Sequence, residues 1–318
     1  MYLNEFAPSG APLDMTTFKE FDSLLQSAGD LGIPHSRDVH YVSRNVVLNG
    51  IRFHLLDWGD PSAPPLIVLH GGNQSAHSWD LVSLHLADRF HVIALDQRGH
   101  GDSEWARDAD YTVPQMADDL VALLEHEQLA RPIIMGHSMG GLVTLTLALR
   151  RPEIQTAIVL VDSGPRASTQ GVMTIRNFIT HNTEFDHIDK FVDRVVAYDP
   201  YRSREHIERT ARYNLIQRVD GAYISKSDRI LHDADFRTRR ERSAPSFDAS
   251  HLAALHFPVL VVRGQRSNIL EPVAAEQFVA QLPQGALVTV PDCGHNVHTQ
   301  NTPGFLQQVR PFLDGQIA

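Results

Sequence analysis

Gly136-His137-Ser138-Met139-Gly140 is the stretch that decides the fold. An apolar run, residues 132–135, precedes it, and an apolar pattern with helical spacing, residues 142–149, follows it. A Gly-x-Ser-x-Gly sequence between a strand and a helix is typical of a sharp turn that lifts the serine clear of the sheet edge. The flanking glycines let neighbouring backbone pass without a Cβ clash. We therefore predict that Ser138 is a nucleophile; the alternative is a glycine-rich turn carrying an ordinary serine.

Short apolar runs alternate with helical patterns on both sides of this turn. A β-hairpin is predicted first, because two strand patterns flank Asn49-Gly50, a strong two-residue turn signal. Continuous Val/Ile/Leu runs separated by helices indicate a parallel sheet that helices cover on both faces, with ligands at the carboxyl ends of its strands. The sequence thus predicts an α/β fold with a mostly parallel eight-stranded sheet. Its expected strands are residues 46–48, 52–58, 66–69, 91–95, 133–135, 157–161, 259–262 and 286–290.

The alternation stops after the fourth parallel run, residues 157–161, and resumes near residue 257. The interruption contains helical patterns, among them residues 188–198 and 204–217, but no clear parallel strand. It is too long for a loop. We therefore predict a helical cap at residues 164–256, inserted into an α/β core that consists of residues 41–163 and 257–318.

Residues 1–40 precede the alternating pattern and are predicted to form an N-terminal extension with one amphipathic helix. Its apolar residues recur at helical spacing, at Phe18, Phe21, Leu24 and Leu25. The pattern leaves open whether this helix docks on the body of the chain or on a second subunit of a homodimer.

The overall composition is that of an ordinary globular protein, with 318 residues and 42% hydrophobic content. A net charge of −10 argues against nucleic acid or anionic membranes as partners. The single cysteine, Cys293, excludes an internal disulfide and fits a reducing compartment. The N-terminus has no signal-peptide pattern, and no apolar run reaches membrane-spanning length. These features predict a cytoplasmic protein that acts on a small molecule.

Four motifs resemble those of the α/β-hydrolase fold superfamily, and their order is similar over residues 45–315. The resemblance is closest to the cap-bearing branch, which holds esterases, lactonases and C–C hydrolases. Epoxide hydrolases and haloalkane dehalogenases of that branch carry aspartate at the position of Ser138, so the resemblance disfavours both. The matching pieces are His70-Gly71-Gly72, Asp96-Gln97-Arg98-Gly99-His100-Gly101-Asp102-Ser103, Gly136-His137-Ser138-Met139-Gly140-Gly141 and Asp292-Cys293-Gly294-His295.

A serine hydroxyl needs a base to take its proton, and in this topology the histidine comes last in the chain. His295 follows the last apolar strand and should reach the sheet edge that carries Ser138. His298 is the nearby rival. The histidines at positions 70, 100 and 137 are expected to hold loops. The sequence has no His-Glu-x-x-His and too few cysteines for a zinc site, so neither a metal nor an organic cofactor is expected.

An oxyanion hole requires two fixed N–H donors. The amide of Met139, directly after the nucleophile, is the first candidate. The resemblance implies that the second is the amide of Gly72, the third residue of the His-Gly-x motif. Asn73 is expected to contribute a side-chain donor or to line the pocket. Residues 96–103 are expected to have a structural role.

The catalytic acid is the open position, because the usual station after residues 259–262 holds Asn268 where relatives often have aspartate. Asp162, at the carboxyl end of the preceding core strand, is our predicted acid. Glu271 is a second candidate, although its place before Pro272 also suits a helix N-terminus. The third reading is a Ser-His-Asn site, weakened or inactivated, because asparagine cannot balance the imidazolium charge.

Together these residues predict a serine hydrolase that cleaves a small ester or lactone through an acyl-enzyme. The alternatives are an amide or C–C bond hydrolase with the same catalytic groups, or a ligand-binding receptor with little turnover. The predicted pocket residues are Asn73, Trp79 and Asn268, with the cap aromatics Phe178, Phe185, Tyr198, Tyr201, Tyr213 and Tyr223 as further candidates.

Overall fold

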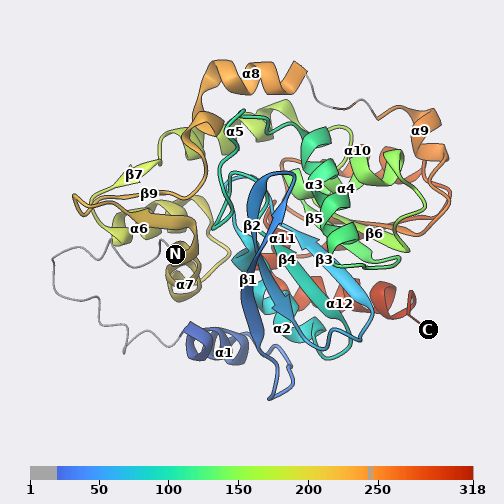
Figure 1. Ribbon diagram of the computed structural model, residues 1–318, viewed down its shortest axis with the longest axis horizontal. Helices are drawn as coiled ribbons and strands as arrows, with labels where there is room; N and C mark the ends of the chain where they lie inside the picture. The colour runs from blue at the N-terminus through green and yellow to red at the C-terminus, as the bar shows by residue number, and fades with distance from the viewer. Residues whose placement is uncertain (1–19, 243–244, 246, 318) are drawn as a thin grey trace.

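A single eight-stranded sheet runs through the centre of the molecule (Figure 1). The computed structural model describes residues 20–242, 245 and 247–317. The strand order is β1-β2-β4-β3-β5-β6-β10-β11. Only β2 is antiparallel to its neighbours, and all other adjacent pairs are parallel. The predicted α/β class and mostly parallel sheet are therefore confirmed. The strands are β1 Tyr41–Leu48, β2 Ile51–Trp58, β3 Pro65–Leu69, β4 His91–Leu95, β5 Ile133–His137, β6 Ala157–Val161, β10 Val259–Gly264 and β11 Gly285–Val290.

The burial of each strand follows from its composition. The central strands β4, β5, β6 and β10 are buried at every residue, as continuous apolar runs require. The edge strand β1 alternates between exposed and buried residues at its end. Between β1 and β2, Asn49 and Gly50 both have positive φ, at 51° and 75°, which is the conformation of the predicted two-residue hairpin turn.

Helices cover both faces of this sheet (Figure 1). On one face α3, α4 and α10 pack on the apolar side chains of the strands. On the other face α1, α2 and α12 do the same, with the short α11 beside them. The helices of the core are α1 Glu20–Asp30, α2 Asp80–Leu86, which the 3-10 turn η1 Ala76–Trp79 precedes, α3 Val113–His126, α4 Met139–Arg150, α10 Pro272–Val279, α11 Val297–Gln300 and α12 Thr302–Asp314.

The predicted N-terminal helix is present as α1 and packs on the body of the chain. Leu24 and Ala28 are its buried residues, and Phe21 and Leu25 pack partly against the same core cluster. The helix contacts both α2 and α7. Residues 1–19, including Phe18 of the predicted pattern, lie outside the described residues.

Residues 164–256, called the insert below, leave the sheet after β6 and return to it before β10. The insert is mostly helical but also contains a small antiparallel sheet in the order β7-β9-β8. The expectation of a helix through residue 217 was wrong, because α7 ends at Asn214 and residues 215–217 pair with β9. Its elements are α5 Thr169–Thr180, β7 Glu184–Phe185, α6 Ile188–Tyr198, α7 Arg204–Asn214, β8 Leu215–Gln217, β9 Tyr223–Ser225, η2 Arg229–His232, α8 Ala234–Arg242 and α9 Ala249–Ala253.

Polar contacts join the insert to the core. Arg209 of α7 forms a buried ion pair with Asp80 of α2 at 2.7 Å. Lys226 pairs with Asp102 at 2.6 Å, and the backbone amide of Asp228 donates to the carbonyl oxygen of Gly99 at 2.9 Å. The insert is thereby held over the loop that contains residues 96–103.

None of the helices in the described part of the chain is both long enough and apolar enough to span a membrane.

Candidate active site

Ser138 stands at the sharp turn between β5 and α4. Its φ of 50° lies in the left-handed region, which is unusual for a residue with a side chain and indicates local strain. The turn closes so tightly that a Cβ on Gly136 would lie 2.3 Å from the carbonyl oxygen of Gly140. A Cβ on Gly140 would lie 2.5 Å from the carbonyl oxygen of Leu69. Both glycines are therefore required by close backbone approach.

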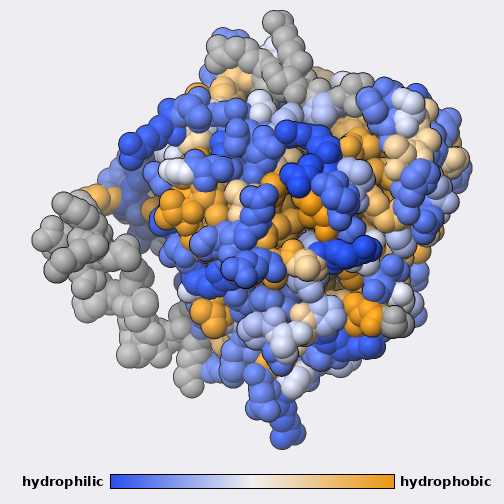
Figure 2. Space-filling model, turned by 45° about the vertical axis from the view of Figure 1, so that its right-hand side comes forward, coloured by the Kyte–Doolittle hydropathy of each residue, from blue (hydrophilic) through white to orange (hydrophobic). Residues whose placement is uncertain are grey.

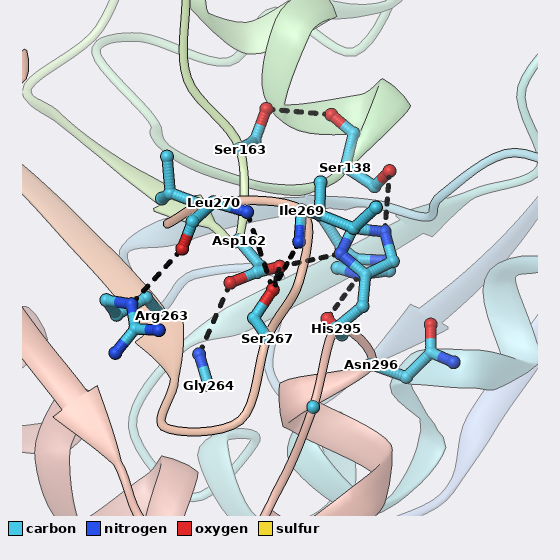
Figure 3. A network of polar contacts seen from close by, with 12 residues as sticks. Ser138, Asp162, Ser163, Arg263, Gly264, Ser267, Ile269, Leu270, His295 and Asn296 are labelled. Atoms are coloured by element: carbon cyan, nitrogen blue, oxygen red, sulfur yellow. Dashed lines mark hydrogen bonds and ion pairs between the residues drawn. The ribbon is translucent and has the colours of Figure 1, made fainter. Parts of the chain in front are cut away.

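A continuous line of hydrogen bonds joins Ser138, His295 and Asp162 (Figure 3). His295 Nδ1 lies 2.7 Å from Asp162 Oδ2, and His295 Nε2 lies 3.0 Å from Ser138 Oγ. Because a carboxylate only accepts, Nδ1 of the neutral ring carries the proton and donates it to Asp162. The lone pair of Nε2 then faces the serine hydroxyl, as a general base requires.

Asp162 follows directly after β6 and is fully buried. Besides the His295 ring, its carboxylate accepts hydrogen bonds from the amide of Gly264 at 3.3 Å and from Ser267 Oγ at 2.5 Å. Gly264 is the last residue of β10, and Ser267 lies in the segment that follows it, the usual station of the acid (Figure 3). That segment thus supports a carboxylate from the neighbouring strand instead of supplying one.

The two rival acid positions point elsewhere. Asn268 is exposed, and its backbone carbonyl packs against Gly171 of the insert. Glu271 is also exposed and occupies the N-cap position of α10. The His295 Nδ1 that either residue would have to meet is bonded to Asp162 instead.

His137, inside the elbow motif, fixes the loop that carries His295. Its Nε2 lies 3.0 Å from the carbonyl oxygen of His295, an acceptor, so Nε2 donates this bond. Burial lowers the pKa of His137 well below its usual value, and the neighbouring His295 and His298 lower it further. His137 is therefore a neutral structural residue. Sequence reasoning expected it to hold a loop, and the Gly-His-Ser order of the elbow was the signal.

Gln74 joins the loop after β3 to the loop that carries His295, and sequence reasoning missed it. Its Oε1 accepts from the amide of Gly71 at 3.0 Å, and its Nε2 donates to Asn296 Oδ1 at 3.0 Å. Gln74 thus connects the glycine loop to the residue after His295. Its position next to His70-Gly71-Gly72 was the only signal in the sequence.

His298, the rival base, does not take part in the line of hydrogen bonds. Its ring stacks on Trp79 with the centroids 4.0 Å apart. Burial lowers the pKa of His298 to about 3, and the charge of Arg202 acts in the same direction. A buried, neutral ring stacked on an indole is a packing residue.

The two amides predicted for the oxyanion hole belong to residues that line one cavity with Ser138. Gly72 lies in the loop after β3, and Met139 is the first residue of α4. Asn73, which also lines the cavity, has a φ of 60°. Its Oδ1 accepts hydrogen bonds from Ser225 Oγ at 3.0 Å and from Ser227 Oγ at 2.7 Å. Asn73 therefore anchors the insert as well as lining the pocket.

The cavity over Ser138 measures about 390 Å³ and lies between the sheet edge and the insert. On the face shown in Figure 2, hydrophobic residues gather in a central area that hydrophilic side chains border. Of the aromatic residues predicted in the insert, Phe178 and Tyr198 line the cavity, and their rings stack at 4.1 Å.

Several predicted pocket residues lie outside this cavity. Trp79 was wrong as a pocket residue, because its side chain is fully buried against His298. Asn268 was wrong as well, because it is exposed and does not line the cavity. Tyr213 stacks on the His77 ring instead. The remaining aromatics that do not line the cavity are Phe185, Tyr201 and Tyr223.

Residues 96–103 shape the loop after β4 through Asp96. Its carboxylate accepts from the amides of Ala76 and Asp102 and pairs with His54 Nδ1 at 2.8 Å. Burial alone would raise the pKa of Asp96, but the hydrogen bond from His54 and the nearby His70 bring it to about 2. The ligand atoms of His54, Asp96 and Asp102 lie within 4.8 Å of one another. Since each already has a protein partner, including Lys226 on Asp102, this cluster is structural.

Comparison with known proteins adds a family and several relatives. A family model described as the alpha/beta hydrolase fold matches residues 64–220. Esterase Rv0045c from Mycobacterium tuberculosis is 27% identical over 316 residues, which cover 95% of this chain and 98% of that protein. The 2-(acetamidomethylene)succinate hydrolase from Mesorhizobium japonicum is 25% identical over 275 residues, which cover 86% of this chain and 96% of that protein.

A solved structure of an alpha/beta hydrolase from Novosphingobium aromaticivorans superposes with a TM-score of 0.75 at 28% identity. The alignment covers 86% of this chain and 98% of that one. The named relatives are thus esterases and other hydrolases that match this chain over most of its length.

Proposed function

The chain belongs to the α/β-hydrolase fold superfamily, and from this premise we propose that it is a serine hydrolase that cleaves a small ester or lactone through an acyl-enzyme. The observation that carries the proposal is the line of hydrogen bonds from Asp162 through His295 to Ser138, which lines a cavity of about 390 Å³. The esterase among the relatives supports the same reaction class.

In the first half-reaction Ser138 Oγ attacks the substrate carbonyl carbon while His295 Nε2 takes the hydroxyl proton. Asp162 orients the ring and stabilises the imidazolium. The amides of Gly72 and Met139 donate to the oxygen that becomes negative. The tetrahedral intermediate then expels the alcohol, which takes the proton back from His295 Nε2.

In the second half-reaction water replaces the alcohol. His295 takes a proton from water, the resulting hydroxide adds to the acyl carbon, and Ser138 leaves with the proton that His295 returns. The free acid is released. The insert acts as a cap that excludes bulk water from the cavity, which strengthens the electrostatic stabilisation of the oxyanion.

An amide hydrolase or a C–C bond hydrolase is the alternative within the same class. Cleavage of an amide, or of a C–C bond beside a ketone, would use the same catalytic groups, and the relatives include hydrolases with different substrates. A receptor with little turnover is the rival from another class. Asn268 was the reason to consider it, and that reason weakens because the buried Asp162 pairs with the histidine.

Hydrolysis of short p-nitrophenyl esters tests the proposal directly. The wild type is expected to release p-nitrophenol at a rate that saturates with substrate, and Ser138→Ala is expected to lose at least ~10⁴-fold in kcat. Trp105, partly exposed and outside the cavity, offers a control, Trp105→Phe, that should retain activity. If Ser138→Ala kept the wild-type rate, Ser138 would not be the nucleophile.

A further inference from the structure

The cavity carries more positive charge than the protein as a whole suggests. The ionisable carboxylates among its described lining residues are Asp162 and Asp199, while Arg176, Arg202 and Arg237 contribute guanidinium groups. Asp162 is committed to His295, and Asp199 to its own partners. A chain with a net charge of −10 thus places three guanidinium groups in the wall of the cavity that Ser138 also lines.

Arg202 is the best fixed of these cations. Its Nε–H donates to Asp199 Oδ2 at 2.7 Å, and its side chain is 13% exposed against 1% for Asp199. Within the described part of the chain, neither Nη1 nor Nη2 of Arg202 forms a hydrogen bond or an ion pair. Asp199 therefore holds one edge of the guanidinium, and the other edge remains available at the cavity wall.

Two buried histidines, His206 and His298, lie near Arg202. His206 and His298 lie close enough for the charge of Arg202 to lower both pKa values, after burial, which is the larger cause. His206 Nε2 and both ring nitrogens of His298 are buried without a hydrogen-bond partner among the described residues. Buried polar groups that lack partners are uncommon, but neither histidine lines the cavity, so Arg202 is the member of this cluster that can meet a ligand there.

The same anchor is connected to the catalytic histidine. Asp199 Oδ1 accepts from Gln300 Nε2 at 2.9 Å, and Gln300 Oε1 accepts from the amide of Gly294 at 2.7 Å. Gly294 directly precedes His295. A substrate group bound at Arg202 therefore lies at the end of a short hydrogen-bonded chain that leads to the His295 loop.

We propose that the substrate carries a carboxylate in addition to the bond that is cleaved, and that Arg202, held by Asp199, binds this carboxylate through its free edge. A guanidinium offers two parallel N–H groups, which match a carboxylate better than any neutral group. The inference rests on the proposed hydrolase function and specifies its substrate class as an ester or lactone that carries a free carboxylate on its acyl or its alcohol part.

Matched ester pairs provide the test, because intrinsic reactivity cancels in the ratio of kcat/KM values. The acyl-side pair is the p-nitrophenyl monoester of adipate against p-nitrophenyl hexanoate. The alcohol-side pair is the butyrate ester of 4-hydroxybenzoate against phenyl butyrate. We expect the wild type to prefer the carboxylate-bearing ester by at least ~10-fold in one pair, the size of a charge-assisted hydrogen bond.

The informative variant is Arg202→Gln combined with Asp199→Asn. Arg202→Gln alone would leave a buried carboxylate unpaired and could prevent folding, whereas the double change keeps a hydrogen-bonded but uncharged pair. It should remove the preference, lowering the ratio at least ~10-fold. Arg166→Gln is the matched control, since Arg166 is exposed and outside the cavity, and its ratio should stay within ~2-fold of the wild type.

Three outcomes overturn the inference. The wild type could show no preference for the carboxylate-bearing ester in either pair. The preference could survive in the double variant, or it could be lost only in Arg237→Gln. In each case the hydrolase proposal is judged separately, by turnover of the neutral esters and by labelling of Ser138 with a fluorophosphonate. A protein that labels but shows no preference keeps its function and loses this substrate class.

Discussion

At the scale of single residues, the acid of the site is Asp162, a fully buried side chain held by hydrogen bonds. Its carboxylate accepts hydrogen bonds from a ring N–H, an amide and a hydroxyl, and these three bonds hold it in one orientation. Ser267 and Gly264 therefore belong to the site although neither reaches the substrate cavity. They set the orientation of Asp162, which sets the tautomer of His295.

Replacement of the acid should slow the reaction without unfolding the site. Asp162→Asn is isosteric but reverses or loses the bond from His295 Nδ1, and the imidazolium loses its counter-charge; we expect kcat to fall at least ~10²-fold. Steady-state kinetics with a p-nitrophenyl ester measure this change.

The matched change on the other station is Asn268→Ala, which removes an exposed side chain and should leave kcat nearly unaltered. Full loss of activity in Asn268→Ala with none in Asp162→Asn would reverse the assignment of the acid.

Sequence reasoning reached Asp162 but could not exclude Asn268, and the reason is physical. Both stations end neighbouring parallel strands, β6 and β10, whose carboxyl ends meet at one sheet edge. The pattern places both side chains near His295, and only the backbone after each strand decides which one turns inward. Asp162 has a φ of 46°, a conformation that is uncommon for residues other than glycine and that the sequence pattern does not reveal.

At the scale of elements, the turn between β5 and α4 depends on close backbone contact at its glycines. Gly140→Ala would place its Cβ 2.5 Å from the carbonyl oxygen of Leu69, so strand β3 or helix α4 must shift. We expect the free energy of unfolding to fall by roughly 1–3 kcal/mol, as for overpacking in a rigid core, measured by urea denaturation.

Gly29→Ala is the control for that change. Gly29 lies in α1 with no atom within 4 Å of its added Cβ, and alanine is the better helix former. Its free energy of unfolding should be equal to or above that of the wild type. Equal stability of both alanine variants would mean that the elbow is looser than these contacts imply.

The insert is fastened to the core by the ion pair between Arg209 and Asp80, whose side chains are 4% and 2% exposed. Arg209→Met would leave Asp80 buried with only the His77 ring as its partner. Loss of one member of such a pair costs about 3 kcal/mol, again measured by urea denaturation.

The contrasting pair joins Arg204 to Asp193 on the surface of the insert. Arg204→Met should hardly alter stability, because solvent screens an exposed pair. A larger loss in Arg204→Met than in Arg209→Met would contradict the role given to the buried pair.

Elements of the core were predictable because a continuous apolar run is a strong signal. His91–Leu95 and Ala157–Val161 have the expected limits. In the insert, α6 matches the expected helix at Ile188–Tyr198, whereas β8 was read as the end of α7. Leu215 adopts extended backbone because it pairs with β9, and the helical period of its side chains carries no information on that pairing.

At the scale of the whole molecule, buried neutral histidines couple stability to pH. The pKa of His298 is about 3 in the folded protein against 6.5 for the free side chain. Between these values the unfolded chain binds a proton that the folded chain does not, so the free energy of unfolding decreases as the pH falls through this window. The contribution is fully present above about pH 6.5.

His298→Phe should weaken this dependence by up to about 1.4 kcal/mol per pH unit while keeping a ring stacked on Trp79. Urea denaturation at several pH values between 6.5 and 4.5 measures the slope. Asp96, with a folded pKa of about 2 against 3.8, loses its contribution only as the pH falls below that range, so it does not interfere. An unchanged slope in His298→Phe would show that His298 already titrates normally in the folded protein.

Labelling with a fluorophosphonate, followed by mass spectrometry of the peptide that contains Ser138, tests the central claim most directly. The reagent modifies a serine only when a base activates it. The account predicts one phosphonyl adduct on Ser138 in the wild type, none in Ser138→Ala, and much slower labelling in His295→Ala. An unlabelled wild-type protein, under conditions in which ordinary esterases are fully labelled, would contradict it.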